Sequence, residues 1–252
     1  MRPASWIGLL LLSAIWATSP APGGIRVLLL TGAGNHDWKA TTPVIRQILE
    51  RSGRFDVSVF DDAASMKPSD LERFDVLLSN YNLFGMPADT PTWGADMRKA
   101  FVVWLERGHG LVVVHAGSSV FYDWSEFQRL AGTSWTSSTS HGRVHDAEVV
   151  MSSVRHPITG GVTNFKTRDE FWQGCRLAEG TVVLATATPR PEHGGSGRPE
   201  PVAMVNALGS GRGFTLLLGH DADCMTNEGF QQLLVHGVER AARGSVSPER
   251  RK

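Results

Sequence analysis

This chain of 252 residues has no formal net charge at pH 7 and few cysteines. Its 25 lysines and arginines balance its 25 aspartates and glutamates, so no net field attracts nucleic acid, and we expect none as a partner. Cys175 and Cys224 are the only cysteines. The sequence is compatible with a disulfide between them and equally with two free, buried thiols.

A long apolar run occurs only at the N-terminus, and it is too short for a comfortable membrane span. Arg2 precedes the apolar residues 6–16, and small residues and prolines fill most of residues 17–24. This pattern is typical of a signal peptide at residues 1–24, with an uncleaved anchor as the alternative. We therefore expect a secreted or periplasmic protein whose mature part has no membrane span.

The rest of the chain contains neither an internal repeat nor a linker, which predicts one domain over residues 25–243. The basic residues 244–252 are interpreted as a disordered tail. Predicted strands at 25–30, 55–60, 75–79 and 111–115 alternate with amphipathic stretches at 42–50 and 92–107. The continuous apolar run at 25–30 is typical of a strand covered on both faces, and the alternation predicts a three-layer α/β fold with a mostly parallel sheet.

The second half of the chain has a looser pattern. Residues 143–151 and 181–187 are predicted to be strands, and 201–208 and 213–218 a β-hairpin around a glycine-rich turn. An amphipathic helix is predicted at residues 228–243.

Histidines follow three of the apolar runs, at the end where open α/β sheets bind ligands. His36 follows the first run, His115 ends the fourth and His220 follows the last. A single such histidine is more often structural, but three at one sheet edge suggest acid/base catalysis or a metal site. They suit a divalent ion, zinc first, with Asp37 or Asp221 as a further ligand or outer partner. No compact metal motif such as HExxH is present.

Two adjacent carboxylates lie in a segment rich in aromatic residues. Glu170 is a candidate acid/base catalyst, and Asp169 is a candidate substrate ligand. The alternative is a salt bridge to Arg168 or Arg176.

Tryptophans near the predicted loops suit a carbohydrate pocket, because aromatic faces stack on sugar rings while amides and carboxylates bind hydroxyls. For any single one of them, packing beneath a loop is the favoured interpretation. These tryptophans are Trp38, Trp93, Trp124, Trp135 and Trp172. The candidate substrate-binding residues are Asn35, Asp37, Trp38, Asn80, His141, Asp169 and Asp221.

Ser118 and Ser119 follow His115 and are conceivable nucleophiles. A nucleophilic serine needs a paired base and an oxyanion hole, and neither is evident from the sequence. Capping of a helix N-terminus is the favoured interpretation of both serines.

Motifs spread along the chain, in order, resemble those of the ThuA-like (trehalose utilisation) family. The matching segments are residues 31–38 (TGAGNHDW), 41–43 (TTP), 113–117 (VVHAG), 132–135 (GTSW), 141–142 (HG), 156–160 (HPITG), 169–172 (DEFW), 211–213 (GRG) and 218–221 (LGHD). The resemblance covers nearly the whole mature chain and also places a histidine at position 141.

The resemblance implies a flavodoxin-like sheet related to the class I glutamine amidotransferases. Those enzymes carry a nucleophilic cysteine in a G-x-C-x-G elbow after a central strand. Here His115 takes the place of that cysteine, so glutamine hydrolysis by that mechanism is excluded. The segment from Gly32 to Gly34 lacks the third glycine of a dinucleotide fingerprint, and we expect no nucleotide cofactor.

The sequence thus suggests an exported enzyme acting on a sugar or keto-sugar derivative, of the isomerase, hydratase or lyase type. Its candidate catalytic residues are His36, His115, His220 and Glu170, and the three histidines are also the candidate metal ligands. The alternative is a non-catalytic carbohydrate-binding or accessory protein on the same fold. The sequence leaves the oligomeric state open.

Overall fold

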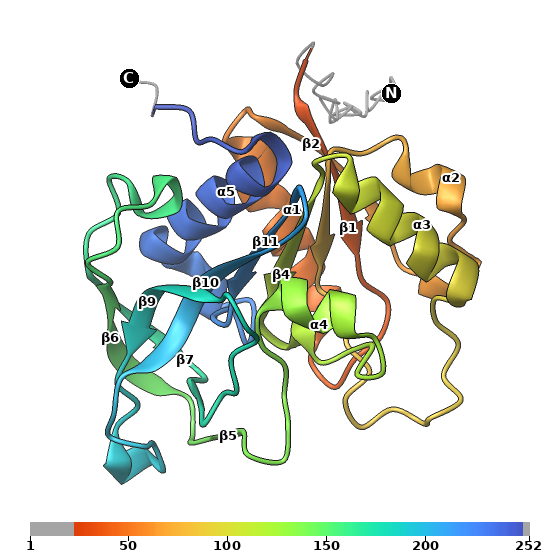
Figure 1. Ribbon diagram of the computed structural model, residues 1–252. Helices are drawn as coiled ribbons and strands as arrows, with labels where there is room; N and C mark the ends of the chain where they lie inside the picture. Colours follow the sequence, from red (N-terminus) through yellow and green to blue (C-terminus); the bar gives the residue numbers. More distant parts are fainter. Residues whose placement is uncertain (1–22, 249–252) are drawn as a thin grey trace, which may run out of the picture.

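The computed structural model describes residues 23–248 (Figure 1). Residues 1–22 of the expected signal peptide and the last four residues of the expected tail lie outside this range. Within it, no helix has the length and apolar character needed to cross a membrane. Both cysteines in the described range are free, so the disulfide is not formed.

A nine-stranded sheet forms the centre of the molecule, in the order β2-β1-β3-β4-β11-β10-β9-β6-β7. Its parallel half consists of β2 (Phe55–Phe60), β1 (Ile25–Leu30), β3 (Val76–Ser79), β4 (Gly110–Val114) and β11 (Gly211–Leu216). Its antiparallel half adds β10 (Glu200–Leu208), β9 (Val182–Ala187), β6 (His145–Met151) and β7 (Phe165–Asp169). The short strands β5 (Ser140–His141) and β8 (Trp172–Gln173) pair separately.

Helices cover both faces of the sheet, as Figure 1 shows. On one face lie α1 (Trp38–Arg51) and α5 (Glu228–Arg243); on the other lie α2 (Pro68–Leu71), α3 (Ala95–Glu106) and α4 (Ser125–Ala131). Strand β1 shows why the apolar run is continuous. Val27 and Leu29 pack with α1 and α5, whereas Leu28 and Leu30 pack with the opposite layer.

The predicted three-layer, flavodoxin-like α/β fold is confirmed, with a mixed sheet whose parallel half contains the first four predicted strands. Helix α1 begins four residues before the predicted position, because the Asp37 side chain accepts a hydrogen bond from the amide of Ala40 and caps the helix there. Pro43 consequently lies inside the helix instead of opening it.

Glycine at position 237 allows α5 to pack closely on β11. A Cβ added to Gly237 would collide with the ring of Phe214, which is buried in the core. This close approach holds α5 against the parallel half of the sheet, which carries three of the site histidines.

We therefore predict that Gly237→Ala lowers the free energy of unfolding by about 1–3 kcal/mol, because overpacking outweighs the better helix propensity of alanine. Gln232→Ala in the same helix is the control, and we expect a change within about 0.5 kcal/mol for this half-buried residue. Urea denaturation measures both. Equal stability of the two variants would show that the contact between Gly237 and Phe214 is not tight.

Candidate metal centre

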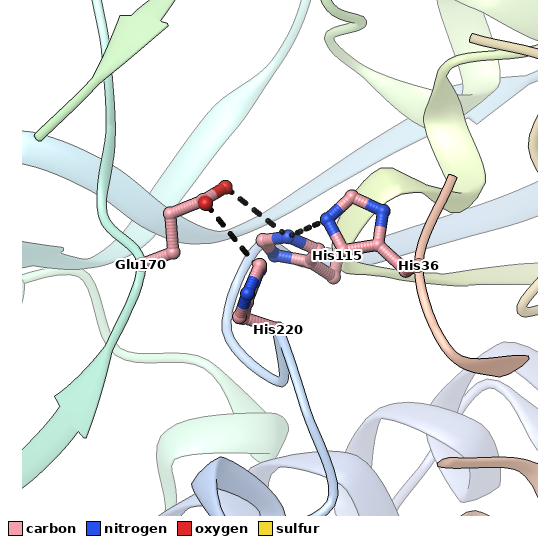
Figure 2. Close-up of side chains that lie close together, drawn as sticks. All are labelled: His36, His115, Glu170 and His220. Carbon is pink, nitrogen blue, oxygen red and sulfur yellow. Dashed lines mark hydrogen bonds and ion pairs between the residues drawn. The ribbon is translucent and has the colours of Figure 1, made fainter. Parts of the chain in front are cut away.

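Four side chains from distant parts of the sequence meet beyond the carboxyl ends of the parallel strands (Figure 2). His36 comes from the loop after β1, His115 follows β4, His220 lies in the loop after β11, and Glu170 follows β7. One nitrogen or carboxylate oxygen of each lies within 4.8 Å of the corresponding atom of every other. The structure thus brings together the three histidines that the sequence places at strand ends.

His115 is held in an unusual backbone conformation. Its φ of 46° lies in the left-handed region, which non-glycine residues seldom adopt and which costs roughly 1–3 kcal/mol. The residue ends β4 abruptly and begins a short 3-10 turn, His115–Ser118. Gly117 makes this turn possible, because a Cβ there would collide with the carbonyl oxygen of Ser79.

Hydrogen bonds outside the cluster set the tautomers of two imidazoles. Nδ1 of His115 lies 2.9 Å from the carbonyl oxygen of Leu217 and therefore donates its proton to it. Nδ1 of His36 lies 3.0 Å from the side-chain oxygen of Asn35 and donates in the same way. In each neutral ring the Nε2 lone pair is then free to face the cluster.

The two Nε2 atoms lie only 3.2 Å apart. Two nitrogen lone pairs that face one another at this distance repel, so a cation has to lie between them. That cation is either a proton or a metal ion. The arrangement is the strongest chemical feature of the site.

Glu170 supplies the negative charge of the cluster. Its carboxylate oxygens lie 3.5 Å from Nε2 of His115, 3.4 Å from Nδ1 of His220 and 3.3 Å from Nδ1 of His141. Trp172 donates its indole N–H to the same carboxylate over 3.2 Å. The carboxylate is thus fixed from several sides.

The alternative interpretation of Glu170, a salt bridge to Arg168 or Arg176, is not what the structure shows. Within residues 23–248 its ion-pair partners are all histidines.

The surroundings of the four side chains determine which of them are charged at neutral pH. Burial opposes ionisation of Glu170, but the hydrogen bond and charge of His115 bring its pKa down to about 2. Burial, reinforced by the other histidines, lowers the pKa of His36 to about 4, and burial also lowers the pKa of His220. Burial opposes charging of His115 as well, yet its contact with Glu170 outweighs this and raises its pKa. At neutral pH the cluster therefore contains a carboxylate and at least two neutral imidazoles.

These groups fit a divalent metal ion. Ligands about 2.0–2.1 Å from a tetrahedral zinc ion lie about 3.3 Å from one another. Three separations in the cluster, of 3.2, 3.4 and 3.5 Å, are close to this value, and all four donor atoms lie within 4.8 Å of one another. Nδ1 of His220 is buried without a hydrogen-bond partner among the described residues, as expected for a ligand atom. The cluster can hold a metal ion, and imidazole with carboxylate is a donor set typical of zinc.

A buried carboxylate behind the cluster positions two of its members. Asp169 is completely buried and accepts hydrogen bonds from the amides of Gly219 (2.7 Å), His220 (3.2 Å) and Glu170 (2.8 Å). Burial raises its pKa to about 6 despite these bonds. The sequence predicts Asp169 as a substrate ligand, but its carboxylate is occupied with the backbone of the two loops.

A cavity of about 170 Å³ opens next to the cluster. Its aromatic wall consists of Phe84, Trp135 and Trp172, and its remaining lining residues are Asn35, His36, Ala116, Ser119, His141, Glu170 and His220. Trp93 and Trp124, in contrast, are buried in the core around α3 and α4. Of the five candidate tryptophans, only Trp135 and Trp172 therefore line this cavity. We call it the metal cleft.

The other predicted site residues lie outside the metal cleft, some in an adjoining cavity and some in turns or helix caps. Trp38 and Asn80 line a small adjoining cavity, where the Asn80 amide donates to the hydroxyls of Thr41 and Thr42. Asp37 caps α1. Asp221 accepts from the amide of Cys224 over 2.8 Å and so closes the turn after His220.

The predicted capping role of Ser118 and Ser119 is wrong. Helix α4 begins only at Ser125, and its N-cap position is occupied by Trp124, whose side chain makes no capping hydrogen bond. Both serines instead belong to the turn after His115 and are buried, and their hydroxyls have no hydrogen-bond partner among the described residues. The sequence favours capping only because serine is common at helix N-termini.

A wider cavity, of about 450 Å³, lies elsewhere and is lined by charges of both signs, including Asp146, Arg168 and Asp223. It contains none of the four clustered side chains. We therefore place the chemistry in the smaller metal cleft.

Comparison with known proteins agrees with the fold. The family model of ThuA, described as trehalose utilisation, matches residues 26–241. A ThuA-like protein from Parabacteroides merdae superposes with a TM-score of 0.77 at 28% identity, covering 91% of this chain and 94% of that one. No curated protein sequence matches the chain.

Two further solved structures are similar in fold alone. A ThuA-like protein from Bacteroides uniformis has a TM-score of 0.64 at 16% identity and covers 92% of this chain and 98% of that one. A cytoplasmic protein from Salmonella typhimurium has a TM-score of 0.62 at 12% identity, with coverages of 87% and 100%.

We predict that the protein, dialysed free of metal, binds one zinc ion per chain. His36→Ala and His220→Ala each remove a ligand and should weaken binding by more than the roughly 10–100-fold that is lost with an outer partner of a metal ligand. His193→Ala, a half-buried histidine outside the cluster, is the control and should bind as the wild type does. Calorimetric titration with zinc chloride measures all four proteins. Equal affinity in the cluster variants would rule out this metal site.

Proposed function

Because the chain belongs to the ThuA family, we propose that it is a metal-dependent enzyme acting on a sugar or keto-sugar. The observation that carries the proposal is the approach of the Nε2 atoms of His36 and His115 to 3.2 Å beside the ionised Glu170. Imidazoles that converge on a carboxylate next to a cleft form a reactive centre, and a structural role explains them poorly.

His36, His115 and His220 would hold the metal, for which zinc is our first choice. A bound divalent ion polarises a carbonyl or hydroxyl oxygen as a Lewis acid. Outer partners keep the ligands oriented: the carbonyl of Leu217 for His115 and the side chain of Asn35 for His36.

Glu170 is the proposed proton acceptor. It is ionised, lies against His115, His220 and His141, and lines the cleft. A carboxylate next to a polarised carbonyl can take a proton from the neighbouring carbon or from a hydroxyl. His141 is more exposed and lies 3.3 Å from Glu170, which suits it to exchange that proton with solvent. Isomerisation, hydration or elimination of a keto-sugar all use these steps.

A carbohydrate substrate is supported by the lining of the cleft and by the family description of trehalose utilisation. Trp135 and Trp172 stand at 83° to one another, with ring centroids 5.1 Å apart, and Phe84 packs against Trp135. These rings offer an apolar wall opposite the polar cluster. Such a division into one apolar and one polar side suits a sugar ring.

We expect the zinc-loaded protein to turn over at least one member of a panel of 3-keto and unmodified disaccharides. Chelation should abolish turnover and added zinc should restore it. Glu170→Gln keeps the shape of the side chain but cannot accept the proton, so kcat should fall by about 10²–10⁴-fold. The zinc content of this variant, by elemental analysis, shows whether its metal is retained.

Two results would count against catalysis. Turnover that survives chelation would contradict the metal dependence. A wild-type protein that binds a disaccharide but turns over none of the panel would favour the alternative, a non-catalytic carbohydrate-binding protein on the same fold.

We also propose that the protein is exported, on the basis of Arg2, the apolar residues 6–16 and the small residues before position 25. Expression of the full chain in a bacterial host should then yield a mature form outside the cytoplasm that lacks about 20–25 N-terminal residues. Mass spectrometry of the fractionated protein measures this. An intact chain retained in the cytoplasm would contradict export.

A further inference from the structure

Ser119 has a buried hydroxyl without a partner, and it lies at the wall of the metal cleft. The residue is 1% exposed and its Oγ makes no hydrogen bond within residues 23–248. Buried polar groups in native proteins nearly always have a partner, so each exception calls for an explanation. Because Ser119 lines the cleft, a ligand that enters the cleft can supply the missing bond.

The backbone of Ser119 is fixed on both sides. Its amide donates to the carbonyl oxygen of Ala116 over 2.8 Å, and its carbonyl oxygen accepts from the amide of Leu83 over 3.0 Å. Phe84, which follows Leu83, is part of the aromatic wall. The turn that positions His115 thus also positions Ser119.

Tyr122 is the competing explanation. Burial raises the pKa of the Tyr122 phenol, and a contact with the Ser119 side chain lowers it in part, so the two side chains lie close together. The Ser119 Oγ nevertheless makes no hydrogen bond within residues 23–248, to Tyr122 or to any other residue. Tyr122 is also 50% exposed and can bond to water in place of Ser119.

We propose that Ser119 is a substrate-binding residue, whose hydroxyl bonds to one oxygen of a sugar while another oxygen of the same ring lies at the cluster of His36, His115, His220 and Glu170. This inference rests on the proposed function. Ser119 sets the orientation of the ring, and Phe84 and Trp135 cover its apolar face.

The size of the cleft narrows the substrate class. Its volume of about 170 Å³ is below the roughly 300–1,000 Å³ of sites for drug-sized ligands. It has room for one sugar ring. In a disaccharide the second ring lies outside the cleft, so recognition by Ser119 concerns the ring that carries the reacting carbonyl.

Ser118 provides a matched control. It is the neighbouring residue, is also fully buried, and also has a hydroxyl without a hydrogen-bond partner in the described part of the chain. Unlike Ser119, it is not among the residues that line the metal cleft. Removing either hydroxyl takes one oxygen from the same turn, but only Ser119→Ala changes a residue that lines the metal cleft.

The test compares the wild type, Ser118→Ala, Ser119→Ala and Tyr122→Phe, all as full chains loaded with zinc. Calorimetry with 3-ketotrehalose and with trehalose gives the Kd. We expect Ser119→Ala to bind 3-ketotrehalose about tenfold more weakly, the effect of one lost hydrogen bond, and the other two variants to remain within about twofold of the wild type.

Thermal unfolding without sugar gives a second readout. Ser119→Ala should unfold no earlier than the wild type, because its hydroxyl has no partner in the free protein. Its thermal shift on adding 3-ketotrehalose should be smaller than that of the wild type.

Three results would overturn the inference. In the first, Ser119→Ala binds the sugar as tightly as the wild type, which leaves the proposed function intact. In the second, Ser119→Ala and Tyr122→Phe both unfold earlier without sugar, which means that the two hydroxyls bond to one another. In the third, the zinc-loaded wild type binds neither sugar, and the proposed function fails as well.

Discussion

The site depends on two imidazole nitrogens that face one another across 3.2 Å. A hydrogen bond at the other nitrogen, Nδ1, holds each ring in this orientation. His115 donates to the carbonyl of Leu217, and His36 donates to the side chain of Asn35. The rings therefore cannot relieve their repulsion by exchanging tautomers without losing those bonds. A cation between them is the simplest way to satisfy both, and Glu170 supplies the charge that makes a divalent ion acceptable.

The fold maintains this arrangement at some cost. His115 stays in the left-handed region because the turn around it is tightly packed, with Gly117 against Ser79. Asp169 is fully buried, and its carboxylate accepts hydrogen bonds from three backbone amides. These bonds join the loop after β11 to the loop after β7. Glu170 belongs to the antiparallel half of the sheet and the three histidines to the parallel half. Asp169 is thus the residue through which the two halves form one site.

Most of the parallel half could be predicted from the sequence because β1, β3 and β4 are buried on both faces and therefore appear as nearly unbroken apolar runs. The three histidines could be found because each directly follows such a run, and the carboxyl ends of parallel strands share one edge. Glu170 could be proposed only from its neighbours and from the family resemblance. Its pairing with histidines instead of Arg168 or Arg176 depends on how β7 is placed across the sheet.

Other features depend on tertiary contacts that have no local pattern. Asp169 is of a residue type that commonly binds substrate. Only the folded chain shows that its carboxylate accepts hydrogen bonds from backbone amides instead. Ser118 and Ser119 are of a residue type common at helix caps. The left-handed conformation of His115 instead places them in a 3-10 turn, and α4 begins only at Ser125. Trp93 and Trp135 are indistinguishable in sequence, although one fills the core and the other lines the cleft.

The most direct test of the account is to locate the metal. Crystals of the protein soaked in zinc chloride should be measured on both sides of the zinc absorption edge. We expect one anomalous peak about 2.0–2.1 Å from Nε2 of His36, Nε2 of His115 and Nδ1 of His220. Crystals that take up zinc only elsewhere, with the two Nε2 atoms still facing each other and no ion between them, would contradict it.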